Sequence, residues 1–294
     1  MFSILIPSYN YNVYPLVSEL YKQCLECNVE FEILCQDDAS NQIELENQKI
    51  NSLENCNFSK NNLNLGRGKN INFLAKKAKF AWLLIMDCDT FPTKNNFIQK
   101  YISQINEDER VVFGGIKYQK EKPSSDQFLR WLYGNARESL SVEERNKNPN
   151  GNALTSNILI QKEVFISNLF DKTITKYGYE DLVFLTDLKN KGILVKHIDN
   201  PTYHLGLETS QQFLEKTKIA LENLKSISST NSLERSESKI LKASSLLKNL
   251  HLTFFISFLF KKLGRKIDHN LLSEKPSLLL FDLYKLGYFC SLKN

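Results

Sequence analysis

Two aspartates, Asp87 and Asp89, follow a run of five apolar residues at 82–86 that has the pattern of a buried strand. Because side chains alternate along a strand, both carboxylates should point to the same side. Two neighbouring carboxylates repel each other unless a cation lies beside them. Their oxygens suit a hard divalent cation such as Mg²⁺ or Mn²⁺. The pair therefore predicts a metal site, and the plainer alternative is a strand end with two solvated acids.

A second acidic pair, Glu180 and Asp181, stands in the stretch Tyr-Gly-Tyr-Glu-Asp (177–181). A carboxylate that is partly desolvated and within reach of a hydroxyl can act as a general base. The alternative is a helix start, where acidic side chains oppose the dipole favourably. His204 follows in Pro-Thr-Tyr-His-Leu-Gly. A lone histidine is more often structural than functional.

The elements that carry these groups alternate between strand and helix. Residues 2–6, 31–35, 82–86 and 111–113 have strand patterns, while 13–27, 43–54 and 70–79 have helical spacing. This order predicts an α/β domain with a mostly parallel sheet flanked by helices. Ligands bind outside the carboxyl ends of the strands in such sheets. The polar stretches 7–10, 36–40 and 87–90 should therefore gather at one edge.

The alternation is lost after about residue 115. We expect loops at 119–127 and 146–152, a short helix at 128–137, a strand at 192–197 and an amphipathic helix at 211–224. Residues 226–238 are rich in Ser, Thr and Asn and predict a linker. The chain thus divides into a main domain at 1–225, with parts at about 1–115 and 116–225, the linker, and a helical extension at 239–294.

The extension is basic and apolar. It holds ten Lys/Arg against three Asp/Glu, a net charge of +7, whereas the whole chain carries +5. The apolar stretch 250–263 is too short to span a bilayer but suits a helix at a membrane interface, flanked by Arg265 and Lys266. This predicts peripheral contact with anionic lipid and no nucleic-acid partner. The alternative is a helical hairpin that packs on itself or on the main domain.

The N-terminal residues and the cysteines bear on the compartment. Met1 leads directly into an apolar run without a basic region or cleavage site, so we expect no secretory signal. Cys24 and Cys27 form a C-x-x-C pair that no second pair completes into a zinc site. Reduced thiols are the simpler interpretation. We therefore expect a cytoplasmic protein, with the option of a peripheral position on the cytoplasmic face of a membrane.

Five ordered motifs resemble those of inverting nucleotide-sugar glycosyltransferases of family 2, which have the GT-A (Rossmann-like) fold. The resemblance covers roughly residues 1–225. The D-x-D motif alone is weak evidence, whereas the ordered set is specific. The motifs are Ile-Pro-Ser-Tyr-Asn (6–10), Asp-Asp-Ala-Ser (37–40), Asn-Leu-Gly-Arg-Gly-Lys-Asn (64–70), Asp-Cys-Asp (87–89) and Tyr-Gly-Tyr-Glu-Asp (177–181).

The resemblance implies a nucleotide site in the first part of the domain. Asp89 is implied as the direct ligand of Mn²⁺ or Mg²⁺, with Asp87 nearer the ribose. A metal there would neutralise charge on the departing nucleoside diphosphate. Basic groups at a helix start favour phosphate oxygens. The remaining implied nucleotide contacts are Pro7, Ser8 and Tyr9, the base-recognising Asp37 and Asp38, and Arg67 and Lys69 near the phosphates.

The second part of the domain is implied to hold the acceptor. Asp181 matches the general base, Glu180 contacts acceptor or donor sugar, and His204 matches a further metal ligand. Tyr179 can stack on a sugar ring. Weaker candidates for sugar contacts are Ser156, Asn157 and Trp131, and a buried position is equally expected for Trp131.

The expected function is a metal-dependent inverting glycosyltransferase, of the hexosyltransferase class, that acts in glycan or polysaccharide synthesis. It would move a sugar from a nucleotide-sugar, UDP by family habit, to a hydroxyl of a glycan or lipid-linked glycan. One alternative is a sugar-1-phosphate nucleotidyltransferase, whose Gly-rich loop after the first strand is replaced here by Pro-Ser-Tyr-Asn. The other is an inactive GT-A-like protein that binds glycans. A retaining mechanism is not excluded by the motifs.

Overall fold

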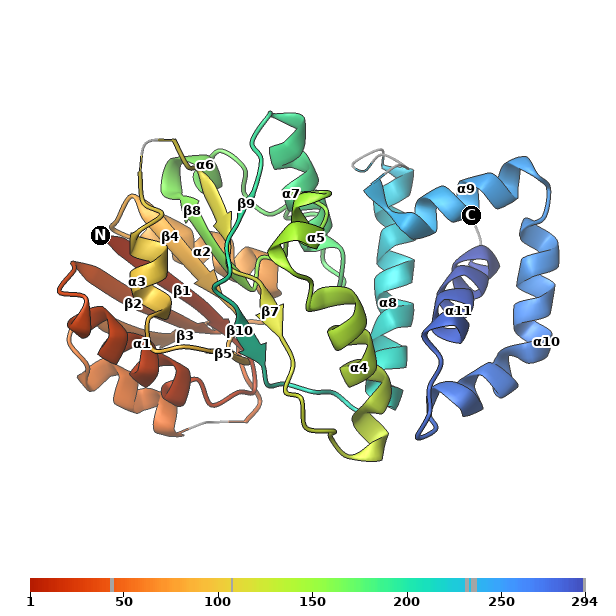
Figure 1. Ribbon diagram of the computed structural model, residues 1–294, viewed down its shortest axis with the longest axis horizontal. Helices are drawn as coiled ribbons and strands as arrows, with labels where there is room; N and C mark the ends of the chain where they lie inside the picture. Colours follow the sequence, from red (N-terminus) through yellow and green to blue (C-terminus); the bar gives the residue numbers. More distant parts are fainter. Residues whose placement is uncertain (43–44, 107, 231–232, 234–236, 293–294) are drawn as a thin grey trace.

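A seven-stranded sheet lies at the centre of the computed structural model, which describes residues 1–42, 45–106, 108–230, 233 and 237–292 (Figure 1). The strand order is β3-β2-β1-β4-β8-β6-β9, and only β8 runs antiparallel to its neighbours among these strands. The predicted mostly parallel α/β sheet is confirmed. The strands are β1 (Phe2–Ser8), β2 (Phe31–Asp37), β3 (Cys56–Lys60), β4 (Trp82–Met86), β6 (Val111–Phe113), β8 (Asn157–Gln161) and β9 (Lys196–His197).

The central strands are apolar throughout because both faces of the sheet are covered. Alternate residues enter two separate cores: Leu84 and Met86 of β4 face one core, and Leu83 and Ile85 face the other. The first core is covered by α1 (Tyr14–Glu26), the 3₁₀ helix η1 (Leu45–Ser52) and α3 (Phe97–Ile102). The second is covered by α2 (Arg67–Lys77), α6 (Lys162–Ile166) and α7 (Glu180–Asn190).

Several predicted boundaries change. The helix expected at 70–79 begins at Arg67, directly after Gly66, whose φ of 83° suits the turn into the helix. The helix expected at 43–54 is the 3₁₀ helix η1, and residues 43–44 lie outside the described part. The strand expected at 192–197 is wrong for its first four residues, since β9 spans only Lys196–His197.

A second, three-stranded sheet was not predicted. Its order is β5-β10-β7, with β5 (Thr90–Pro92), β7 (Ile116–Lys117) and β10 (Thr202–His204). These strands are too short to show a period in the sequence. Between β7 and β8 the chain forms short helices. They are η2 (Ser125–Gln127), α4 (Phe128–Tyr133), a π-helical turn η3 (Gly134–Glu138) and α5 (Val142–Asn146).

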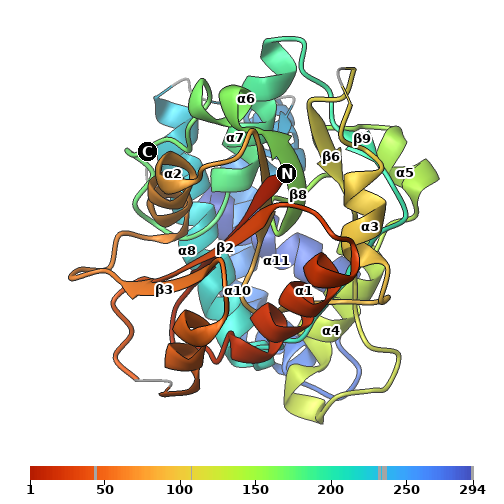
Figure 2. The ribbon, with the colours of Figure 1, turned by 90° about the vertical axis from the view of Figure 1, so that its left-hand side faces the viewer.

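Four helices complete the chain: α8 (Ser210–Ser229), α9 (Lys239–Asn249), α10 (Thr253–Leu271) and α11 (Leu278–Ser291). Helix α8 continues to Ser229, so it occupies the first residues of the predicted linker 226–238; residues 231–232 and 234–236 lie outside the described part. Seen from the β3 side, α8, α10 and α11 lie behind the sheet (Figure 2).

The helices of the extension pack on the main domain. Phe281 and Tyr284 of α11 bury themselves against Leu129 of α4 and Leu214 of α8. No single helix of the described residues is both long and apolar enough to cross a membrane. The pair α9 and α10 passes that test together, with a bend of 116° between them.

Candidate active site

A cavity of about 300 Å³ lies at the carboxyl ends of β1, β2 and β4. Its position is the one expected for a ligand site in a parallel sheet. Seven of the predicted nucleotide and metal residues line it, so the three polar stretches do gather at one edge. These residues are Pro7, Ser8, Tyr9, Asp38, Arg67, Asp87 and Asp89. We call this space the donor cavity.

A tight turn, and not strand alternation, places the two aspartates. Strand β4 ends at Met86. The backbone carbonyl of Asp87 then accepts hydrogen bonds from the N–H of Thr90 at 3.2 Å and from its hydroxyl at 2.7 Å. The N–H of Asp87 donates to the carbonyl of Ser156 at 3.1 Å. Strand alternation is therefore the wrong reason for their placement, although both carboxylates do face the same cavity, as predicted.

Strand pairing brings His204 to Asp89. Strands β10 and β5 are antiparallel, with His204 opposite Thr90, and the N–H of Leu205 donates to the carbonyl of Asp89 at 2.8 Å. The imidazole Nε2 lies 3.5 Å from Asp89 Oδ2. The ring of Tyr118 stacks on His204 with centroids 5.4 Å apart. The β5–β10 pairing thus brings together two residues that are more than a hundred positions apart.

Gly206 was missed by the sequence reasoning. A Cβ atom at this position would lie 2.4 Å from Asp89 Oδ2, closer than real Cβ atoms approach. The glycine therefore leaves the space that the Asp89 carboxylate occupies. Its signal in the sequence was its place two residues after His204, which has no meaning until the β5–β10 pairing is known.

The donor set at Asp89 and His204 fits a divalent cation that a ligand helps to hold. With metal–ligand bonds of roughly 2.1 Å, two donors on one ion lie about 3 to 4 Å apart, which agrees with their 3.5 Å separation. His204 Nδ1 is buried without a hydrogen-bond partner among the described residues, so its ring is held by stacking. In the same part of the chain no three His, Cys, Asp or Glu side chains form a complete metal site. Further ligands would come from the bound substrate.

A second cavity of about 500 Å³ lies beside the first and shares Arg67 and Asp87 with it. It contains the predicted residues Tyr179, Glu180 and Asp181. We call this space the acceptor cavity. Its outer walls come from α8 and α11, through Phe213, Lys216, Thr217, Ala220, Leu221, Phe281 and Lys285.

Arg67 joins the two cavities. Its Nε donates to Asp87 Oδ1 at 2.7 Å, and its Nη1 donates to Asp181 Oδ1 at 2.9 Å. Burial lowers the pKa of Arg67, but Asp87 and Asp181 raise it by more, so the guanidinium stays charged. Burial raises the pKa of Asp87. Arg67 lowers this pKa, but the negative charges of Asp89 and Asp181 raise it further, and the net shift is upward. One guanidinium thus faces more negative charge than it can neutralise, which favours a cation in the donor cavity.

Thr155 fixes the position of Asp181. Its hydroxyl donates to Asp181 Oδ1 at 2.5 Å, and its N–H donates to Oδ2 at 3.2 Å. The hydroxyl also accepts from Arg67 Nη1 at 3.0 Å. The sequence pointed to the neighbours Ser156 and Asn157 and not to this fully buried threonine, because the residue type alone does not indicate a contact with a side chain 26 positions away.

Glu180 has a different environment from Asp181. Its Oε2 is buried without a hydrogen-bond partner in the described part of the chain. Burial raises the pKa of Glu180, and the nearby Asp181 raises it further. An unpaired buried carboxylate oxygen costs free energy unless a ligand satisfies it. Glu180 is therefore placed to contact a bound hydroxyl.

The backbone before the acid pair is held in a left-handed turn. Gly178 has φ 92° and Tyr179 has φ 68°. A left-handed backbone conformation is unusual for a tyrosine, and such conformations are found preferentially at functional sites. Helix α8 stabilises the turn: Asn223 donates to the carbonyl of Gly178 at 2.6 Å, and Ala220 packs where a side chain at 178 would lie. The turn aims Glu180 and Asp181 from the start of α7 into the acceptor cavity.

Six predicted residues line neither cavity: His204, which contacts Asp89 as described above, and the five that follow. Asp37 is buried and accepts from the N–H of Ser40 at 2.7 Å, and Lys69 lies in the first turn of α2. Ser156 is buried behind Asp87. Asn157 is fully buried, and Tyr101 and the carbonyls of Gly115 and Asn200 satisfy its amide, so the geometry does not support a sugar contact. Trp131 donates to the carbonyl of Gln119 at 2.8 Å on the surface of α4.

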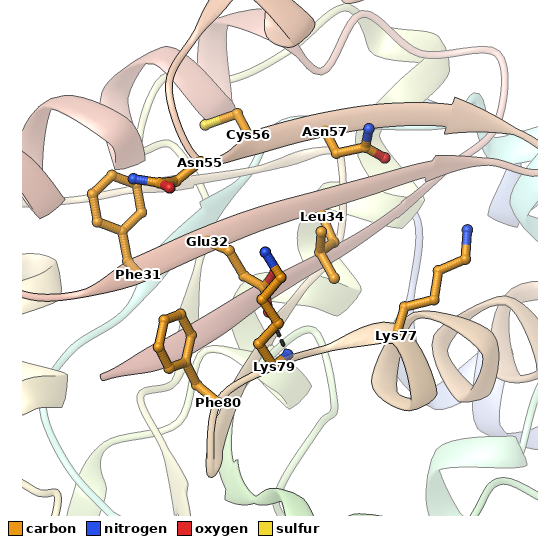
Figure 3. A pocket seen from close by; sticks show the side chains of 9 residues that line it. All are labelled: Phe31, Glu32, Leu34, Asn55, Cys56, Asn57, Lys77, Lys79 and Phe80. Atoms are coloured by element: carbon orange, nitrogen blue, oxygen red, sulfur yellow. Dashed lines mark hydrogen bonds between the residues drawn. The ribbon is translucent and has the colours of Figure 1, made fainter.

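A further cavity of about 360 Å³ lies at the opposite end of the strands, between β2, β3 and the end of α2 (Figure 3). Glu32 points into the region, but its carboxylate accepts from the hydroxyl of Ser3 at 2.6 Å and from the N–H of Lys79 at 2.5 Å. Both hydrogen bonds go to the same oxygen, Oε1, and tie Glu32 to the surrounding backbone and Ser3. This cavity lacks the concentration of acids seen at the carboxyl edge.

The fold and the position of the cavities agree with the GT-A class of glycosyltransferases, and the sequence comparison shows the family. The model of the family "Glycosyl transferase family 2" matches residues 3–167, and the chain belongs to this family. No curated protein sequence matches the chain significantly.

Solved glycosyltransferase structures have the same fold. Mannosyl-3-phosphoglycerate synthase from Rubrobacter xylanophilus is 15% identical (TM-score 0.54; 80% of this chain and 76% of that chain covered). S. aureus TarS is 19% identical (TM-score 0.53; 97% and 54%). Mannosyltransferase PcManGT from Pyrobaculum calidifontis, solved with GDP-Man and Mn²⁺, is 13% identical (TM-score 0.52; 77% and 64%). The chain thus spans less than two thirds of the length of the last two, and at these identities the likeness concerns the fold.

Proposed function

We propose that the protein is a metal-dependent, inverting glycosyltransferase that moves a sugar from a nucleoside-diphosphate sugar to a hydroxyl of a glycan or lipid-linked glycan. The observation that carries this proposal is the pair of cavities that meet at Arg67 and Asp87. One cavity has the carboxyl-edge position of a nucleotide site. The other presents Asp181 to whatever lies in it.

The donor cavity would hold the nucleotide and its phosphates. Asp38 lines it, and its carboxylate also accepts from the N–H groups of Leu65 at 2.9 Å and Gly66 at 2.8 Å, which fixes the loop before α2. Arg67 then stands at the start of that helix, where N–H groups and basic charge favour phosphate oxygens. Asp87 would lie nearer the ribose. We propose UDP as the nucleotide on the strength of the motif resemblance.

Asp89 and His204 would hold Mn²⁺, or Mg²⁺, together with oxygens of the donor. When bound, the ion would supply positive charge to the departing diphosphate. The protein's own contribution is to fix both side chains through the β5–β10 pairing and to leave space for the carboxylate at Gly206. The solved complex of the P. calidifontis mannosyltransferase with GDP-Man and Mn²⁺ supports this assignment by analogy of fold.

Asp181 would accept the proton of the acceptor hydroxyl as that oxygen attacks the anomeric carbon. It lines the acceptor cavity, which meets the donor cavity at Arg67 and Asp87, so a hydroxyl bound there would lie close to the donor. Glu180 would bind an acceptor or donor hydroxyl with its unpaired oxygen. The aromatic side chains Tyr133, Tyr177, Tyr179, Phe213 and Phe281 give walls on which sugar rings can stack.

The test measures nucleotide release from UDP-, GDP-, CMP- and dTDP-sugars with Mn²⁺, with and without candidate glycan acceptors. We expect release of a nucleoside diphosphate from one donor class, loss of release with a chelator, and a fall of about 10³-fold or more for Asp181→Asn, which cannot take a proton. Asp199→Asn, an exposed acid outside both cavities, is the matched control. Silence with every donor, or full turnover in Asp181→Asn, would overturn the proposal.

The same experiment separates the rival functions. Membership of family 2 argues against a sugar-1-phosphate nucleotidyltransferase, and such an enzyme would consume a nucleoside triphosphate and release pyrophosphate. An inactive glycan-binding protein would bind an acceptor without releasing nucleotide from any donor.

A further inference from the structure

An apolar elbow between α9 and α10 is exposed to solvent. We define it as residues 246–258. The exposed fraction is 83% for Phe254, 54% for Phe255 and 53% for Phe258, and Leu246 and Leu250 are exposed by 60% and 56%. Soluble proteins rarely expose several large apolar side chains in one segment, and such a cluster indicates a contact surface.

The elbow is a projecting corner. The two helices are bent by 116°, and His251 makes the turn in a left-handed conformation with φ 57°. Helix α10 forms the end of the molecule away from the seven-stranded sheet (Figure 1). A projecting apolar corner has no groove in which a partner helix could lie, but it can insert into the interface of a lipid bilayer.

Helix α10 has two different faces. One face packs on α11: Leu271 is buried, and the ring of Phe260 lies 5.4 Å from that of Tyr284 and over Gly287, where a side chain would collide with it. The other face carries the exposed phenylalanines in its first half. Because residues three, four and seven apart share a side of a helix, the same face continues into basic residues. These are Lys261, Lys262, Arg265 and Lys266, all exposed.

The charges on this face are unbalanced. Within the described part of the chain, none of the four basic side chains has an ion-pair partner, and Asp268 is the one acid in α10. A second copy of the chain that covered this face by two-fold symmetry would bring the same cations together. An anionic lipid surface instead matches both halves: phenylalanine rings enter the boundary of the acyl chains, and lysine and arginine reach the headgroups.

We propose that this elbow docks the protein on an anionic lipid membrane, with Phe254, Phe255 and Phe258 inserted and the basic half of α10 on the headgroups. The protein then lies peripherally on the membrane surface. The inference goes beyond the transfer reaction and does not depend on it.

The experiment measures co-sedimentation of the full chain with vesicles of phosphatidylcholine, with and without phosphatidylglycerol, in the absence of donor and acceptor. We expect binding to the anionic vesicles that weakens at high salt, and little binding to neutral ones. Phe254→Ser/Phe255→Ser should weaken binding at least about tenfold, because the variant loses the apolar surface that each phenylalanine buries in the membrane. Lys261→Glu/Lys262→Glu should weaken it by a similar factor.

Matched controls exist elsewhere on the surface. Leu45→Ser/Leu194→Ser removes two exposed apolar side chains from the main domain, and Lys76→Glu/Lys77→Glu reverses two adjacent exposed charges on α2. Both should bind vesicles like the unchanged protein. The proposal is overturned if the full chain ignores anionic vesicles, if neutral and anionic vesicles bind equally, or if the elbow variants bind unchanged. It is also overturned if the chain forms a dimer that the phenylalanine variant dissolves without any vesicle binding.

Discussion

Gly206→Ala should damage the metal-binding side of the active site while it leaves the fold intact. The added Cβ would lie 2.4 Å from Asp89 Oδ2 and 3.0 Å from Asp89 Cβ. A carbon–oxygen contact needs roughly 3.3 Å, so the carboxylate must move by about 1 Å. The described residues offer the Asp89 side chain one close polar partner, His204, at 3.5 Å. The carboxylate is therefore free to turn away at a cost of about 0.5–1.5 kcal/mol in strain.

A small cost in stability then accompanies a large cost in activity. A displacement of about 1 Å in a reacting group lowers the rate by on the order of 100-fold, which corresponds to about 2.7 kcal/mol of transition-state stabilisation. We expect Gly206→Ala to keep the thermal unfolding midpoint within a few degrees of the unchanged protein, since about 1 kcal/mol shifts Tm by roughly 2–4 °C in a chain of this size. The activity loss should come with weaker binding of Mn²⁺.

Two assays separate these effects. Electron paramagnetic resonance of Mn²⁺ with nucleoside diphosphate present measures metal binding without turnover, and nucleotide release from the best donor measures kcat/KM. Leu205→Ala is the control, because the side chain of Leu205 is 42% exposed and only its backbone contacts Asp89. Unchanged Mn²⁺ binding and unchanged kcat/KM in Gly206→Ala would refute the assignment of Asp89. A collapse of Tm would refute the claim that the displacement is local.

Three further predictions concern the acids around Arg67. Thr155→Val should lower kcat by about 10- to 100-fold, the loss expected when a hydrogen bond worth about 1.5–3 kcal/mol to the charged Asp181 disappears, and Thr155→Ser should restore most of it in the same nucleotide-release assay. Arg67→Lys should weaken inhibition by nucleoside diphosphate at least about tenfold, because one ammonium cannot pair with both Asp87 and Asp181; an unchanged inhibition constant would contradict this. Glu180→Gln should raise the free energy of unfolding at neutral pH: burial raises the pKa of Glu180, so the folded state holds its proton above the usual range and loses stability as the pH rises through that window. We expect the Tm of the variant, measured from about pH 4 to 8, to rise relative to that of the unchanged protein as the pH increases. A constant difference in Tm over this range would contradict the raised pKa of Glu180.

The sheet and the donor cavity could be predicted because they depend on local sequence. Strand β4 was predicted at its observed bounds, since a continuous apolar run of five residues that ends in acids has few other interpretations. The stretches that follow parallel strands must meet at one edge, so the sequence alone predicts that Ser8, Asp38 and Asp87 lie together, and they do. The lost detail was geometric: a turn stabilised by Thr90, and not strand alternation, sets the two aspartates.

Long-range pairings could not be predicted, and they complete the site. Thr155 meets Asp181 through a contact across 26 residues, and Gly206 meets Asp89 only because β10 pairs with β5. Strands of three residues carry too few side chains to show a period. Asn157 was predicted to contact a sugar, but its side chain lies inside the core. Tyr101 and two backbone carbonyls form hydrogen bonds with its amide there.

The sequence of the apolar stretch 250–263 is compatible with packing on the protein and with contact to lipid. Helix α10, which contains most of this stretch, has one packed face and one exposed apolar face. Phe260 packs on α11, whereas Phe254 and Phe258 lie on the bare side. Helix α11 in turn carries Phe281 and Lys285 into the wall of the acceptor cavity. One layer of helix therefore separates the proposed lipid contact from the space in front of Asp181. An acceptor attached to such a lipid would have to reach Asp181 around this layer, because side chains of α8 and α11 form that wall of the cavity.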